Sequence, residues 1–172
     1  MKKTAIWLSA FLACSLIGFG QEIQIKDQAA FSYAYLDGQG SYQQIPRKIM
    51  EFMGAFFKQG LQPAGPPFGI YFNAPGQVPE TELKWLIGMP VAPAAAPVDP
   101  LKKGEFKAGS VAVCVHVGPY DNVAETYAKM TVFIDANGWK VAGPPLERYI
   151  DNPQMVAADK VRTEIVLPVE KK

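Results

Sequence analysis

The sequence is poor in the residues from which metal sites, catalytic triads and covalent cross-links are built. Its 172 residues include 2 cysteines and 1 histidine, at spacings that match no zinc-ligand pattern. His116 and Cys114 fall in one apolar stretch, and no nucleophile with a nearby base accompanies the histidine. We interpret both side chains as structural, and we expect no metal and no cofactor.

A surplus of charge of one sign is also missing. The 17 basic and 16 acidic residues leave a net charge of +1. No basic stripe of the kind that follows a phosphate backbone is visible, and no helix-turn-helix pattern is present. Nucleic acid is therefore not an expected partner.

Residues 1–20 resemble a secretory signal peptide. Two lysines precede an uncharged apolar run from Ala5 to Phe19, and small residues before Gln21 provide a cleavage site. The run is shorter than the about 20 apolar residues that span a membrane. We expect cleavage after Gly20 and a mature protein that is periplasmic or secreted.

Cleavage would also remove Cys14, one of the two cysteines. Cys114 would remain as the sole thiol, which excludes an internal disulfide and leaves an ordinary apolar core to stabilise the fold. The less favoured alternative is a lipid anchor on Cys14, because Leu is absent from the third position before it. Only that lipidated form would be held at a membrane.

One phrase occurs twice in the chain, as AGPPFGIYF at 64–72 and AGPPLERYI at 142–150. The same offset of 78 residues also pairs, without a gap, Tyr42 with Tyr120, Gly60 with Gly138 and Pro75 with Pro153. Chance does not supply a gapless match over about seventy residues. The sequence therefore predicts two copies of one unit, at 21–91 and 101–172, joined by a Pro/Ala linker at 92–100.

Each copy is predicted to fold as strand, helix, strand, strand. Valines at every second position predict a strand at 110–117, and 31–36 is its counterpart. Apolar residues at steps of three and four predict a helix after each, with Ser41 and Asp121 as expected caps and Gly60 and Gly138 as ends. Shorter strands are expected at 69–72 and 82–89, and at 146–150 and 160–167.

These elements predict an α+β fold made by tandem duplication. Each copy would place one long helix on an antiparallel sheet, with the copies related by a pseudo-twofold axis. Because one copy alone would bury too little apolar surface, we expect the two to pack together. A cleft between them is the expected place for a small ligand.

Three stretches of the second copy resemble the GyrI-like small-molecule-binding domain, which is also the effector-binding domain of AraC-type and MerR-type regulators. They are HVGPYDNVAETY at 116–127, GPPLERYIDNP at 143–153 and VRTEIVLPV at 161–169. The resemblance covers 21–169 and is weaker in the first copy. It implies a pocket between the copies, lined by aromatic side chains, with an acidic residue placed to meet a cationic or polar ligand.

The resemblance implies Glu164 as the pocket acid and Tyr149 as the strand tyrosine. The alternative for Glu164 is a surface ion pair with Arg162, which lies two residues earlier on the same side of the strand. Further candidate ligand-binding residues are aromatic side chains on strands of the first copy, where a ring face can attract a cation: Tyr71, Trp85, Tyr33 and Tyr35.

The favoured function is an exported small-molecule-binding protein that captures an aromatic or cationic amphipathic ligand and lacks a DNA-binding segment. Two alternatives stay open. One is a hydrolase of strained-ring electrophiles that uses Glu164 and Tyr149, and the other is a protein-interaction module of the cell envelope. Catalysis is the less favoured reading, and the sequence does not identify the ligand.

Overall fold

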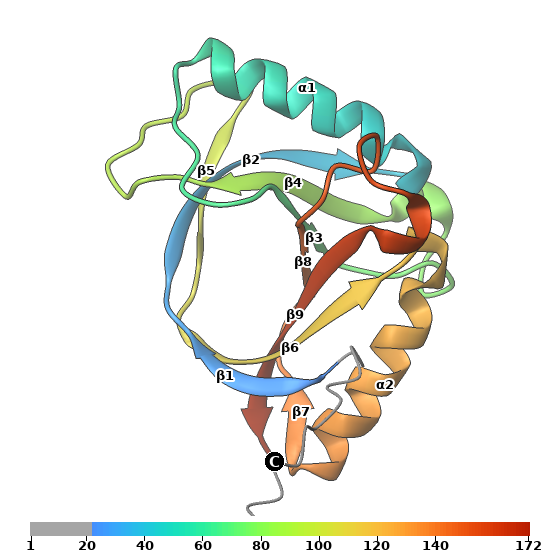
Figure 1. The fold of residues 1–172 in the computed structure, drawn as a ribbon. Helices are drawn as coiled ribbons and strands as arrows, with labels where there is room; N and C mark the ends of the chain where they lie inside the picture. Colours follow the sequence, from blue (N-terminus) through green and yellow to red (C-terminus); the bar gives the residue numbers. More distant parts are fainter. Residues whose placement is uncertain (1–21) are drawn as a thin grey trace, which may run out of the picture.

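The computed structural model describes residues 22–172, so the expected signal peptide and Cys14 lie outside the described residues. One curled antiparallel sheet and two helices make up the described part (Figure 1). The helices are α1 (Ile45–Lys58) and α2 (Val123–Ala136). The strands are β1 (Gln24–Gln28), β2 (Phe31–Gln39), β3 (Phe68–Tyr71), β4 (Lys84–Pro90), β5 (Lys102–Phe106), β6 (Gly109–Val117), β7 (Trp139–Val141), β8 (Leu146–Tyr149) and β9 (Arg162–Lys171).

The elements of the two halves recur at a constant spacing. β2 begins at Phe31 and β6 at Gly109, and the same offset of 78 residues relates α1 to α2 and β3 to β8. The α+β class and the antiparallel pairing are confirmed. The origin of the repeat in a gene duplication stays a prediction.

Three strands of the structure were not expected from the sequence: β1, β5 and the three-residue strand β7, which pairs with β9. β1 and β5 each precede the strand with which their half was expected to begin, and they lie at the two ends of the strand order β1-β6-β9-β8-β3-β4-β2-β5. Their sequences, QIKDQ and KKGEF, are mostly exposed and lack alternating apolar residues. Edge strands with polar side chains carry little periodic signal.

The first strand of each half pairs with the other half. β1 pairs with β6, and β5 pairs with β2. In addition, β3 and β8 pair at the middle of the order, so the halves share one sheet instead of forming separate ones. We call the line where β3 meets β8 the seam; there Gly69 lies opposite Glu147.

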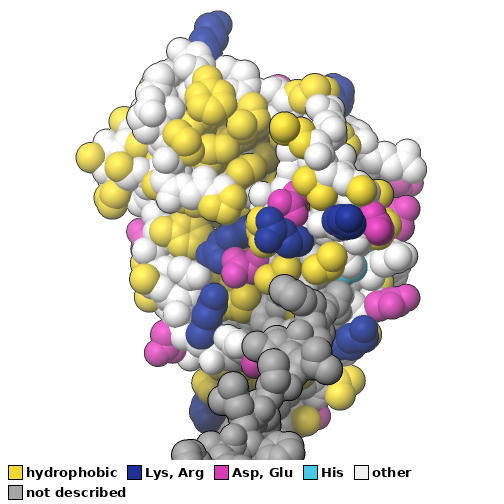
Figure 2. Space-filling view, in the orientation of Figure 1, with side chains coloured by type: hydrophobic (Ala, Val, Ile, Leu, Met, Phe, Trp, Pro, Cys, Tyr) yellow, Lys and Arg dark blue, Asp and Glu magenta, His cyan; other side chains and the backbone are white. Residues whose placement is uncertain are grey.

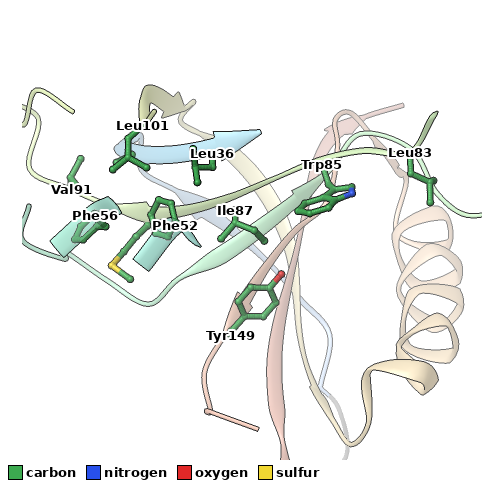
Figure 3. Close-up of a cluster of buried hydrophobic side chains, with 11 residues drawn as sticks. Leu36, Phe52, Phe56, Leu83, Trp85, Ile87, Val91, Leu101 and Tyr149 are labelled. Carbon is green, nitrogen blue, oxygen red and sulfur yellow. The ribbon is translucent and has the colours of Figure 1, made fainter. Parts of the chain in front are cut away.

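Both helices cover the same face of this sheet, which we call the helix face. Ile87, Gly69, Glu147 and Ile165 are register partners on successive strands, so their side chains share a face. Ile87 packs with Phe52 and Phe56 of α1 (Figure 3). Ile165 packs with residues of α2 in a separate cluster.

The opposite face carries a third apolar cluster, which joins strands of both halves. Its buried members include Tyr33, Phe68, Leu146 and Val166. On the helix face, Phe52 and Phe56 are fully buried, whereas Phe57 is 54 % exposed. A helix turn of 100° per residue carries position 57 past the apolar stripe.

The ends of the helices agree only in part with the sequence expectation. Gly60 and Gly138 follow the two helices with φ of 68° and 76°, as predicted for the left-handed residue after a helix. Ser41 accepts a hydrogen bond from Gln43 N at 3.3 Å and so caps a short 3-10 turn before α1. Asp121 lies inside the matching turn before α2 and is not the cap.

The segment at 92–100 contains neither helix nor strand. It is nevertheless fastened to the end of α1, because the side-chain amide of Gln59 donates to Val98 O at 2.8 Å and accepts from Val98 N at 2.9 Å. Within residues 22–172, no helix has the length and apolar character needed to cross a membrane.

One packing contact at the edge of the helix face can be tested directly. A Cβ on Gly38 would overlap the ring of Trp85, its partner on β4. We expect Gly38→Ala to lower the free energy of unfolding by about 1–3 kcal/mol. The control is Gly54→Ala in α1, where a Cβ meets no atom within 4 Å and should stabilise the helix by about 1 kcal/mol. Equal urea midpoints for the two variants would contradict this account.

Candidate functional site

The acidic group at the seam is Glu147, whose side chain points into the helix face. Its residue is 7 % exposed. Burial raises the pKa of this carboxyl above its ordinary value of 4.5, while hydrogen bonds from Tyr127 and Tyr71 oppose the shift. Removing a carboxylate from water is costly unless its charge is paired, so this position needs an explanation beyond packing.

The recorded partners of Glu147 are phenols. Tyr127, from α2, donates its hydroxyl to Glu147 Oε1 at 2.7 Å. Burial, and then the nearby carboxylate, raise the pKa of Tyr127, so the phenol stays protonated and can donate. Glu147 forms no ion pair with any of residues 22–172. The carboxylate is therefore hydrogen-bonded without a counter-charge.

Tyr71 and Tyr149 meet across the seam. They are equivalent residues of the two halves, 78 positions apart, and their hydroxyl oxygens lie 2.7 Å from each other. Gly69 makes room for this pair, because a Cβ at that position would sit 2.5 Å from the Tyr149 oxygen and 2.9 Å from the Tyr71 oxygen. Burial raises the pKa of both phenols.

Two further tyrosines form a rim around the pair. The ring centroids of Tyr42 and Tyr71 lie 5.1 Å apart in an edge-to-face arrangement. In the second half, the ring centroids of Tyr120 and Tyr149 lie 6.3 Å apart, also edge to face. Tyr42 donates to Asn73 O at 2.5 Å, and burial raises its pKa to about 12. Tyr120 is 40 % exposed. We call the five tyrosines around Glu147 the tyrosine cup: Tyr42, Tyr71, Tyr120, Tyr127 and Tyr149.

The structure does not bring Glu164, the pocket acid expected from the sequence, into this cup. Arg148 is the register partner of Glu164, whereas Tyr149 lies opposite Thr163. Because neighbouring residues of a strand point to opposite faces, Glu164 and Tyr149 are on different sides of the sheet. Glu164 forms ion pairs with Arg148 and Lys26.

The expected ion pair between Glu164 and Arg162 is not formed. Arg162 instead binds Asp151, with Nε donating at 2.8 Å and the backbone N–H at 3.0 Å. Because of such ion pairs, acidic and basic side chains lie next to one another on the surface. Figure 2 shows hydrophobic side chains gathered next to α1, and below them a band in which basic and acidic side chains alternate.

The other predicted aromatic residues are divided between the two faces. Trp85 lies on the helix face, opposite Tyr71, but is 1 % exposed and donates its indole N–H to Gly40 O at 3.0 Å. Figure 3 shows the Tyr149 hydroxyl pointing toward Trp85 and Ile87. Tyr33 and Tyr35 belong to the cluster on the opposite face and do not meet Tyr149.

The structural roles expected for the histidine and the thiol agree with their surroundings. His116 is buried; its Nε2 donates to Pro119 O at 3.1 Å, and its Nδ1 lies 2.8 Å from the Thr126 hydroxyl. Cys114 is buried in the cluster under α2, and burial raises the pKa of its thiol. In the described part of the chain, no three acidic, histidine or cysteine side chains gather as metal ligands.

The side chains at the seam are largely buried: Glu147 is 7 % and Tyr149 is 9 % exposed. Two hollows in the described surface lie elsewhere. One is lined by Gln39, Gly40, Ser41, Gln44, Glu80 and Thr81, and the other by residues of α2 between Ala128 and Asn137. A ligand at Glu147 must therefore enter by moving rings of the cup.

Sequence reasoning missed Glu147, Tyr127, Tyr42 and Tyr120. A signal for Glu147 was present, since it precedes Tyr149 by two residues on one strand and so shares its face. It also replaces Gly69 inside the repeated phrase, which marks a position where the halves differ. The contribution of Tyr127 depends on how α2 packs on the sheet, which the sequence pattern does not specify.

Comparison with protein families identifies one match. The model of the GyrI-like small molecule binding domain matches residues 21–170. A search of curated proteins finds no match.

Several solved structures share the fold. The C-terminal domain of EcmrR is 19 % identical, with 88 % of this chain and 99 % of that domain covered and a TM-score of 0.78. In the EcmrR–DNA complex the TM-score is 0.77 at 19 % identity; the match covers 88 % of this chain and spans 58 % of the EcmrR chain.

Two other neighbours carry functional descriptions. A hydrolase from Listeria innocua is 15 % identical, with 87 % of this chain and 92 % of that chain covered and a TM-score of 0.68. SAV2435 bound to tetraphenylphosphonium is 15 % identical, with 87 % and 94 % covered and a TM-score of 0.57. At these identities, the likeness establishes the fold.

The buried carboxyl gives a pH-dependent prediction for stability. Because the folded pKa of Glu147 is raised, its protonated form is favoured in the folded state, and stability falls as pH rises from 4.5 through the folded pKa. Glu147→Gln cannot lose this proton. We expect the variant and the wild type to have equal unfolding free energies below pH 4.5, and the variant to be the more stable at pH 7.

The measurement is chemical denaturation of both proteins across this pH range. The titration of all other groups cancels in the difference between the two curves. A variant that is less stable than wild type by the same amount at every pH would show that Glu147 contributes through neutral packing alone.

Proposed function

Because the chain belongs to the GyrI-like small-molecule-binding domain family, we propose that Glu147 and the tyrosine cup bind a cationic aromatic molecule at the seam. The observation that carries this proposal is a carboxylate at 7 % exposure, held by phenols and by no recorded ion pair of the described residues. A cationic ligand would supply the missing counter-charge.

The surroundings of the carboxylate favour an aromatic cation over a metal ion or a small hydrophilic one. The cup offers ring faces, and a cation within about 6 Å of such a face is attracted by its quadrupole. Its hydroxyls are already engaged, since Tyr71 bonds Tyr149 and Tyr42 bonds Asn73 O. A flat apolar cation can use the rings without needing these hydroxyls as ligands.

Ligand entry requires the Tyr71–Tyr149 pair to separate. The pair is joined by one hydroxyl–hydroxyl hydrogen bond, which is worth only about 1 kcal/mol net in a protein. Tyr120, at the rim, is 40 % exposed, so the edge of the cup is in contact with solvent. The cost of opening lowers the affinity, and the pairing of the buried charge offsets it.

We propose that this binding takes place after export, in the periplasm or outside the cell. The support for export is the signal-peptide pattern of residues 1–20, with its two lysines and uncharged apolar run. The protein would then capture its ligand outside the cytoplasm.

The hydrolase alternative needs different residues from those expected. Glu164 and Tyr149 lie on opposite faces and cannot act on one substrate atom. The pair with suitable geometry is Glu147 and Tyr127, 2.7 Å apart, where a carboxyl with a raised pKa could transfer a proton. A hydrolase among the fold neighbours motivates a turnover assay with an epoxide, whereas no contact favours the protein-interaction alternative.

The binding proposal predicts that affinity for tetraphenylphosphonium depends on Glu147. Hydrogen-bonded or paired charges in proteins are worth about 1.5–3 kcal/mol, so we expect Glu147→Gln to weaken binding about 10- to 100-fold in isothermal titration calorimetry. The matched control is Glu164→Gln, which removes a carboxylate from the opposite face and should leave the affinity unchanged. Binding that survives Glu147→Gln, or is lost equally in both variants, would contradict the proposal.

A further inference from the structure

The two halves differ where they face the seam, although their backbones correspond. Glu147 replaces Gly69, Thr163 replaces Trp85, and Tyr127 replaces Ile49 at the constant offset of 78 residues. Trp85 lies opposite Tyr71, and Thr163 lies opposite Tyr149. Each exchange puts the polar member on the α2 side and the apolar one on the α1 side.

The α2 side of the seam presents groups that seek a polar partner. Besides Glu147 and Tyr127, it contains Thr163, which is fully buried. Thr163 Oγ1 has no partner at hydrogen-bonding distance within the described residues. The nearby phenol is that of Tyr120, whose pKa is raised by burial and lowered in part by its interaction with Thr163. Buried hydroxyl groups are nearly always paired, so an unpaired one on the same face of the sheet as a buried carboxylate points to a partner that arrives from outside.

The α1 side offers no comparable group. Gly69 has no side chain, Ile49 packs as a partly buried alkyl group on the α1 cluster, and the indole N–H of Trp85 is committed to Gly40 O. The α1 side therefore presents the indole ring of Trp85 and the alkyl group of Ile49 to the seam. A charge placed there would lose its hydration without gaining a counter-charge.

From this asymmetry we infer that the site takes an amphipathic monocation in one orientation. The charged head lies against Glu147, Tyr127 and Thr163, and the apolar aromatic body lies toward Ile49 and Trp85. This inference rests on the proposed function and specifies its ligand class. A molecule with a second positive charge at its far end is disfavoured, because the seam holds one carboxylate and not two.

Two matched probes test the charge requirement. One is 4-methylbenzyltrimethylammonium, and the other is para-xylylene-bis(trimethylammonium), which replaces the methyl group with a second cationic head. We expect calorimetry on the wild-type protein at fixed ionic strength to show the dication binding at least about tenfold more weakly. Equal or tighter binding of the dication overturns the inference.

A gain-of-function variant tests the orientation. Ile49→Glu places a carboxylate on α1 where α2 carries Tyr127, at a position that is only partly buried. We expect this variant to bind the dication better than the wild type does, and Ile49→Gln, which adds no charge, to leave the preference for the monocation unchanged. No gain for the dication in a folded Ile49→Glu protein counts against the orientation.

The unpaired hydroxyl supplies an independent readout. Thr163→Val keeps the shape of the side chain and removes the hydroxyl. We expect it to weaken binding of 4-methylbenzylammonium several-fold, since its head carries N–H donors, and to leave the trimethylammonium probe unaffected. An equal effect on both probes overturns the assigned place of the head.

Failure of the inference can be told apart from failure of the proposed function. If the probes bind and Glu147→Gln weakens them, but the dication binds as well as the monocation, the orientation alone is wrong. If no probe binds in a manner that depends on Glu147, the proposed function is wrong and the inference fails with it.

Discussion

The pairing of β3 with β8, which sets Gly69 opposite Glu147, is the constraint on which the rest of the site depends. It joins the two halves into one sheet and fixes which residues of each half share the helix face. With Gly69 at this point, two tyrosine hydroxyls can close over the backbone. With Glu147 facing it, a carboxylate is held beneath the same hydroxyls, where water is largely excluded.

A seam built from two similar halves would ordinarily repeat its side chains on both sides. The tyrosines do repeat: Tyr71 matches Tyr149, Tyr42 matches Tyr120, and the ring contacts within each half are of the same edge-to-face kind. The charge does not repeat. A second carboxylate at position 69 would stand beside the first without a counter-charge, and like charges at such a distance disfavour ionisation of both. The glycine thus keeps the single negative charge tolerable and makes space for the tyrosine pair.

Much of the architecture was predictable because it depends on local patterns, whereas the site depends on how those patterns meet. The gapless repeat located both helices, their terminal glycines and three strands of each half. β1 and β5 were missed because QIKDQ and KKGEF are edge strands without an apolar alternation. Glu164 was preferred to Glu147 because its position matches a family motif, and the alternation of side chains along β8 was not considered. The place of Tyr127 depends on how α2 packs on the sheet, which a strand pattern does not specify.

The closed cup and the buried charge belong to one energetic argument. In the absence of a ligand, the tyrosine pair excludes water, and this exclusion raises the pKa of Glu147 and so weakens the folded state at neutral pH. A neutral ligand would have to open the pair without relieving this penalty. A cation relieves it, because its charge stabilises the ionised carboxylate that burial disfavours. The selectivity for charge therefore comes mainly from relief of the cost of burying the Glu147 carboxylate without a counter-charge, and less from the other contacts that a cation makes.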